Sequence, residues 1–109
     1  MYQIIADTDD FLVVDKHAGV PVHGPSNVPS LIEQLRLDLV NPALNLAHRL
    51  DTGTSGLILV AKSSEANQLL SPLFAQRLVT KRYLALSLGK PSKKQGWVVG
   101  DMLKVRDGN

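Results

Sequence analysis

Residues 48–56 read His48-Arg49-Leu50-Asp51-Thr52-Gly53-Thr54-Ser55-Gly56, and the apolar run Leu57-Ile58-Leu59-Val60-Ala61 follows them directly. The stretch places one carboxylate, that of Asp51, in a turn of small polar residues just before an expected buried strand. Loops on rigid elements commonly carry catalytic groups. An Asp beside Thr and Gly is equally typical of an Asx-turn or a cap that binds its own backbone. The local pattern leaves both interpretations of Asp51 open.

Three segments in a fixed order resemble the motifs of a known family. Residues 48–61 have the form HRLD-x-x-TSG-x-x-x-x-A. Residues 10–23 are similar to the family's opening motif, with His17 standing where Pro is usual. Residues 80–86 contain Lys81-Arg82-Tyr83-Leu84-Ala85 and resemble a second motif, K-x-Y-x-A. On these motifs the chain resembles the RNA pseudouridine synthases of the RluA type.

The resemblance implies a fold and a set of functional residues. The fold would be α+β, with a mixed, mostly antiparallel sheet and flanking helices. Asp51 would be the catalytic carboxylate, and Arg49 would occupy the space that a flipped nucleotide leaves. Tyr83 would stack on the target uracil, while Lys81 and Arg82 would contact backbone phosphates.

Each of these assignments has a structural alternative in the sequence. Arg49 lies two residues before Asp51 and could form a plain ion pair with it, since residues two apart in an extended segment share a face. Tyr83 could be a half-buried strand aromatic. Lys81 and Arg82 could belong to a solvated basic surface. His48 is expected to be a hydrogen-bonded structural histidine rather than a general acid or base.

The implied reaction converts uridine in ribosomal or transfer RNA to pseudouridine. The carboxylate could attack the anomeric carbon, add to the uracil ring or remove a ribose proton, and the sequence does not choose among these routes. No redox change is involved, so no cofactor is expected. His17 and His23 lack a third ligand at suitable spacing, so no metal site is expected.

Two other classes of function stay open. The chain could bind RNA without turnover, because the family's third motif, a basic and apolar segment, has no counterpart here. A glycosidase-like hydrolase using Asp51 is disfavoured, because nothing in the sequence brings a second carboxylate to it.

Composition sets the broad class of the protein. Its 109 residues suit one small domain, and the absence of cysteine favours a cytoplasmic protein without disulfides. The longest apolar run is too short to span a bilayer, so no membrane association is expected. Residues 1–61 carry three basic and seven acidic side chains, whereas residues 62–109 carry nine basic and three acidic ones. A basic half suits a polyanionic partner such as RNA. The oligomeric state is left open.

The hydrophobic pattern predicts the local elements. Strands are expected at 2–6, 11–15, 57–61 and 81–88, with a turn at Asp9-Asp10. Ser30 and Glu33 form a capping box for a helix that ends before Asn41-Pro42. A second helix is expected from 64 to about 77, broken or kinked at Pro72. A basic loop at 90–96 and short paired strands at 97–99 and 102–105 complete the pattern.

The resemblance also bears on domain organisation. The family's catalytic domain is about twice as long as this chain, and the expected turn at Asp107-Gly108-Asn109 has no strand after it. Residues 1–109 are therefore expected to form an incomplete catalytic domain, an N-terminal portion that lacks the third motif. No S4-type RNA-binding domain is expected in front, since the first catalytic-domain strand begins at residue 2.

Overall fold

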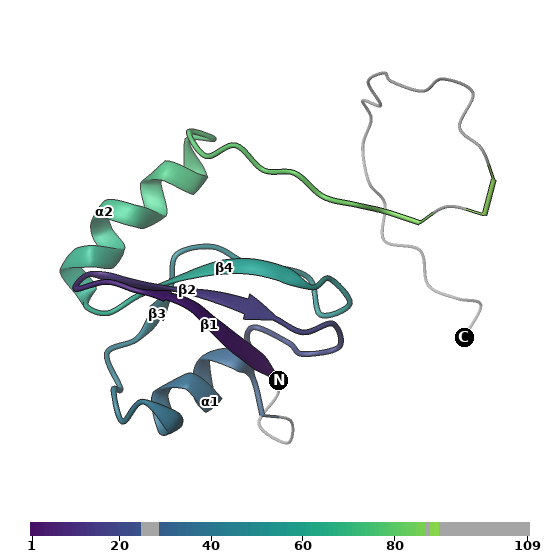
Figure 1. The fold of residues 1–109 in the computed structure, drawn as a ribbon. Coiled ribbons are helices and arrows are strands. Elements are labelled where there is room, and N and C mark those ends of the chain that lie inside the picture. Colours follow the sequence, from purple (N-terminus) through teal and green to yellow (C-terminus); the bar gives the residue numbers. More distant parts are fainter. Residues whose placement is uncertain (25–28, 87, 90–109) are drawn as a thin grey trace.

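The structure is a computed structural model that describes residues 1–24, 29–86 and 88–89. Two helices lie on opposite sides of a four-stranded sheet, α1 below it and α2 above it in Figure 1. The elements in chain order are β1 (Tyr2–Asp7), β2 (Phe11–Lys16), α1 (Leu31–Asp38), β3 (Asn45–Leu46), β4 (Gly56–Ala61) and α2 (Ser64–Ala75).

The sheet has the strand order β1-β2-β4-β3, and each neighbouring pair is antiparallel. β1 and β2 form a hairpin around Asp9-Asp10, and the predicted strands at 2–6, 11–15 and 57–61 are confirmed. The two-residue strand β3 was not predicted, because two residues are too few to show a period. The predicted α+β class with flanking helices is confirmed, and all the described pairs are antiparallel.

One face of the sheet carries the core. Along β2, buried and half-buried positions alternate, because successive side chains of a strand point to opposite faces. The register sets Val14 opposite Ile58 and Leu12 opposite Val60. The α1 residues Leu31, Ile32 and Leu35 join these four side chains in the buried core cluster. The last inward position of β2 is Lys16, which is fully buried.

The predicted capping box of α1 is present. Ser30 Oγ accepts a hydrogen bond from the Glu33 backbone N–H, and the Glu33 carboxylate accepts one from the Ser30 N–H, both at 3.4 Å. The helix ends at Asp38, followed by Leu39 as its C-cap and by Val40 in a left-handed conformation. It therefore stops before Asn41-Pro42, as the sequence predicts.

The prediction that the second helix breaks at Pro72 is wrong. α2 runs from Ser64 to Ala75 as one helix, with Pro72 inside its last turn. Ser71 does not cap a new helix there, because its hydroxyl donates to Asn67 Oδ1 at 3.0 Å. Gln76 is the C-cap, and Arg77 follows with a φ of 57°.

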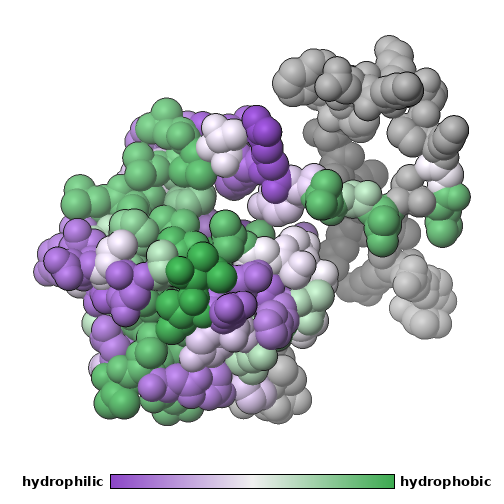
Figure 2. Space-filling view, viewed as in Figure 1, coloured by the Kyte–Doolittle hydropathy of each residue, from purple (hydrophilic) through white to green (hydrophobic). Residues whose placement is uncertain are grey.

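The predicted strand at 81–88 is also wrong for the residues that the structure describes. Residues 81–86 are irregular, and Leu84 and Leu86 are fully exposed. Figure 2 shows hydrophobic side chains standing apart along this segment, away from the body. Alternation alone does not make a strand, because a strand also needs a neighbour to accept its hydrogen bonds. The loop at 90–96 and the strands at 97–99 and 102–105 lie outside the described residues.

Candidate active site

The loop that carries Asp51 joins β3 to β4 and contains a backbone turn. The Thr54 N–H donates to the Asp51 carbonyl at 3.0 Å. The loop ends at Gly56, whose φ of 138° is one that residues with a Cβ rarely adopt. Within the described part of the chain, the Asp51 carboxylate has no hydrogen bond or ion pair, and the residue is exposed. The backbone therefore makes this turn without an Asx bond from the side chain, which leaves the carboxylate available.

The buried side chain of Lys16 binds the backbone of the loop that carries Asp51. Its ammonium donates to the backbone carbonyls of Val20 at 2.8 Å, His17 at 3.1 Å and Thr52 at 3.1 Å. Three acceptors match the three N–H groups of an ammonium. Burial lowers the pKa of Lys16, and the negative charge of nearby Asp51 opposes this shift.

A second contact fixes the same carbonyl. The Gly19 N–H donates to the Thr52 oxygen at 2.7 Å, and Gly19 has a φ of 88°. The peptide between Thr52 and Gly53 is therefore bound both by the end of β2 and by the turn after it. Sequence reasoning missed Lys16 as a site residue. The available signal was a cation at an inward position of an otherwise apolar strand face.

Arg49 and Asp51 are both exposed and flank the buried Leu50. This alternation agrees with the expectation that the two side chains share one side of the segment. No ion pair joins them among the described residues, where the Lys62–Asp7 pair is the single salt bridge. The ion pair with Asp51, which was the structural alternative for Arg49, is therefore absent from the described residues.

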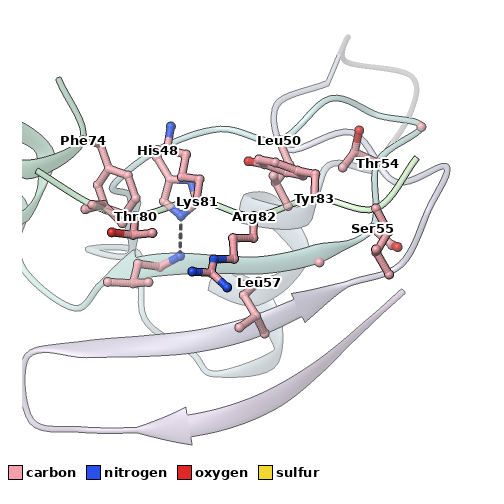
Figure 3. A pocket seen from close by; sticks show the side chains of 15 residues that line it. His48, Leu50, Thr54, Ser55, Leu57, Phe74, Thr80, Lys81, Arg82 and Tyr83 are labelled. Carbon is pink, nitrogen blue, oxygen red and sulfur yellow. Dashed lines mark hydrogen bonds between the residues drawn. The ribbon is translucent and has the colours of Figure 1, made fainter. Parts of the chain in front are cut away.

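His48 is a structural histidine, as predicted. Its Nε2 accepts a hydrogen bond from the Leu59 backbone N–H at 3.0 Å, drawn as a dashed line in Figure 3. Its ring stacks on Phe74, with centroids 4.0 Å apart and an interplanar angle of 13°. Burial lowers the pKa of His48, and the charge of Lys81 lowers it further. The Nδ1 atom is buried and has no hydrogen-bond partner in the described part of the chain.

A cleft of about 680 Å³ lies between the β4 side of the sheet and the segment after α2. In Figure 3, Phe74, His48 and Thr80 gather at one end, and Tyr83, Thr54 and Ser55 at the other. Its lining combines apolar side chains with hydroxyls and two cations. The lining residues are His48, Leu50, Gly53, Thr54, Ser55, Gly56, Leu57, Leu59, Phe74, Val79, Thr80, Lys81, Arg82, Tyr83 and Leu84.

Three of the five predicted site residues meet in this cleft. Lys81, Arg82 and Tyr83 line it from the segment after α2. Tyr83 is 60% exposed, so its ring is not a half-buried strand aromatic. Asp51 and Arg49 do not line the cleft. Leu50 and Gly53, which lie close to Asp51 in the sequence, do line the cleft. Asp51 itself is not part of the lining.

Comparison with known proteins identifies the family. The profile of the family described as RNA pseudouridylate synthase matches residues 10–107, which is most of the chain. The chain belongs to the RNA pseudouridylate synthase family. This confirms the resemblance that the three motifs indicate.

Relatives of the RNA pseudouridylate synthase family share this portion. An uncharacterized RNA pseudouridine synthase of Haemophilus influenzae is 40% identical over 106 residues, covering 97% of this chain and 47% of that protein. A ribosomal large subunit pseudouridine synthase C of Rickettsia bellii is 36% identical, covering 94% of this chain and 35% of that protein. The chain thus spans about half the length of the first relative and about a third of the second.

A solved structure has the same fold. The human RNA pseudouridylate synthase domain containing 1 superposes with a TM-score of 0.58 at 32% identity, covering 71% of this chain and 29% of that one. The human RNA pseudouridylate synthase domain containing 4 gives a TM-score of 0.55 at 28% identity. The α+β body described above is therefore the fold of a pseudouridylate synthase domain.

Neither a metal-ligand cluster nor a membrane-spanning helix is present among the described residues. No group of three or more His, Cys, Asp or Glu side chains comes together there in a way that could hold a metal ion. No helix in this part of the chain has the length and apolar character needed to cross a membrane.

Proposed function

We propose that this chain carries the carboxylate-bearing part of an RNA pseudouridine synthase, which converts a uridine of ribosomal or transfer RNA to pseudouridine. The observation that carries the proposal is the exposed carboxylate of Asp51, which makes no hydrogen bond or ion pair with the described residues, on a loop bound by Lys16. A rigid loop with an uncommitted carboxylate suits a catalytic group, because its position is set before the substrate binds. Membership in the pseudouridylate synthase family supports this assignment.

The proposed reaction requires one carboxylate and no co-reactant. The bond between uracil nitrogen 1 and the anomeric carbon breaks, the base turns, and a bond forms between carbon 5 and the same anomeric carbon. Carbon 5 loses its proton and nitrogen 1 gains one, so the product is an isomer of the substrate. Asp51 attacks the anomeric carbon, adds to the ring or removes a ribose proton, and the proposal includes all three routes. No cofactor or metal enters this balance.

The RNA would be held by the residues around the cleft. Tyr83 would offer an aromatic face to an unpaired uracil, since stacking is the common way to bind single-stranded bases. Lys81 and Arg82 would contact backbone phosphates, which give affinity and position. Arg49 would fill the space that the flipped nucleotide leaves. The relative from Rickettsia bellii is named for the ribosomal large subunit, which supports ribosomal RNA as the partner. The cytoplasm is the proposed location.

A second candidate function is RNA binding without turnover. The observation that favours it is the share of the relatives that this chain spans, 47% for the Haemophilus influenzae protein. The cleft residues could hold RNA while elements that complete the catalytic centre are contributed by sequence outside residues 1–109. Residues 1–109 would then be an incomplete catalytic domain.

The test of the proposed function is Asp51→Asn in the full-length protein, which keeps the size of the side chain and removes its charge. Wild-type protein should release tritium from carbon 5 of labelled uridine in RNA taken from a strain that lacks the activity. Asp51→Asn should release none and still bind this RNA. Asp9→Asn, at the exposed turn between β1 and β2, is the matched control and should behave as wild type. Turnover by Asp51→Asn, with deamidation excluded, would disprove the catalytic role.

A further inference from the structure

Residues 79–84 form one wall of the cleft, but this segment is only weakly attached to the sheet and the helices. The chain leaves α2 through Arg77, whose φ is 57°, and the Leu78 N–H donates to the Leu73 carbonyl at 2.8 Å. Beyond this point, no backbone hydrogen bond of residues 79–86 to the rest of the described chain is present. Side-chain contacts must therefore set where this wall lies.

Phe74 on α2 contacts a side chain of this segment. The Lys81 Nζ atom lies over the Phe74 ring, 5.7 Å from its centroid. A cation at this distance is attracted by the negative face of an aromatic ring. Phe74 is half-buried and lines the cleft together with Lys81. The ring is thus placed to set the direction of the Lys81 side chain.

Phe74 is itself held by the sheet. Its ring stacks on His48 at 4.0 Å, and His48 Nε2 accepts the Leu59 N–H of β4 at 3.0 Å. Figure 3 shows Phe74 and His48 side by side at one end of the cleft, with the hydrogen bond leading down to the strand. A continuous series of contacts therefore runs from Leu59 through His48 and Phe74 to Lys81.

We infer that Phe74 is a positioning residue, which attaches the segment 79–84 to the body and directs Lys81 into the cleft. The functional consequence rests on the proposed function, in which Lys81 contacts an RNA phosphate. Phe74 acts only through Lys81 and the residues next to it. Its aromatic face is the property that matters, because an aliphatic side chain of similar size has no face that attracts the ammonium.

The positioning role is tested first without RNA, by NMR of the full-length protein. In the wild type, the methylene protons of Lys81 nearest the ammonium should resonate upfield of those in a flexible lysine, because the Phe74 ring shields them. Phe74→Leu should return them to the flexible value, while Phe74→Tyr should keep the upfield shift. Leu73→Ala, on the same helix but outside the cleft, is the control and should also keep it. Shielding that persists in Phe74→Leu, or is absent from the wild type, overturns the inference.

The second measurement is binding of a fluorescent single-stranded oligouridylate. Phe74→Leu should weaken binding about two- to fivefold, the size expected for an exposed cation–π contact. Lys81→Met should also weaken binding, and the double variant should lose no more than Lys81→Met alone, because Phe74 acts through Lys81. Losses that add in full would overturn the inference. Absence of oligouridylate binding by the wild type, with the upfield shift intact, would contradict the proposed function and leave the positioning role standing.

Discussion

The Lys16 ammonium lies 3.1 Å from the carbonyl oxygen of Thr52, the residue that follows Asp51. The two residues are 36 positions apart in the chain, and the contact lies at the point where the register sets Lys16 opposite Gly56. Three backbone carbonyls share this buried cation, and the negative charge of nearby Asp51 favours its protonated form. Folding of the core and placement of the candidate catalytic loop therefore depend on the same side chain.

Replacing Lys16 should destabilise the protein. Lys16→Met keeps the apolar stem of the side chain but leaves the carbonyls of His17 and Val20 without this donor, while the Thr52 carbonyl keeps only the Gly19 N–H, at a cost of about 1–3 kcal/mol. The free energy of unfolding from urea titration measures this loss. Lys62→Met is the matched control, because Lys62 forms a surface ion pair with Asp7 and should cost about 0–1 kcal/mol. Equal effects of the two substitutions would show that the buried ammonium contributes no more than a surface charge.

His48 should make stability depend on pH. Burial and Lys81 lower its pKa in the folded protein, so below about pH 6.5 the unfolded chain binds more protons. The His48 contribution is therefore fully present above the unfolded pKa and is lost as the pH falls towards the folded pKa. Urea midpoints of both proteins are measured from about pH 8 to about pH 5, a range that spans the reference pKa of histidine. The midpoint should fall less steeply with decreasing pH in His48→Gln than in the wild type. A constant difference between the two proteins over this range would contradict the lowered pKa.

Tyr83 should contribute to RNA binding through its ring. It is 60% exposed, so removing it should change folding stability little. Tyr83→Ala should weaken binding of an oligouridylate by about 1–3 kcal/mol, the usual contribution of base stacking. Tyr83→Phe keeps the ring and should retain most of the affinity. Leu86→Ala, in the same segment but outside the cleft lining, is the control. If Tyr83→Ala and Tyr83→Phe bind alike, the ring does not stack on a base.

The 109-residue chain, purified as it stands, should bind RNA weakly and make no pseudouridine. Its relatives are about twice as long or longer, and Leu84 and Leu86 are fully exposed in it. Exposed apolar side chains and open sheet edges favour self-association. Light scattering should therefore show oligomers, and tritium release from labelled uridine should be absent. A monomer that forms pseudouridine would show that these residues suffice for catalysis.

Much of the fold and the family followed from local sequence patterns. Short apolar runs beside turn residues predicted three of the four strands, because runs of this length are typical of strands. The Ser30–Glu33 capping box marked the start of α1, and its N-cap bonds are local. The fixed letters of the motif at 48–56 indicated the family that the comparison confirms. Charge and cysteine content described the class of the protein but located no site.

Other features were decided only by the tertiary structure. Alternation at 81–86 predicted a strand, yet none forms in the described residues, because pairing depends on a neighbour distant in the chain. No local pattern connects Lys16 with Thr52, or Phe74 with His48 and Lys81. Each contact joins separate elements, and it exists only once register and helix packing have brought them together. Sequence periodicity reports which face a residue occupies, whereas only the folded chain determines what lies across from it.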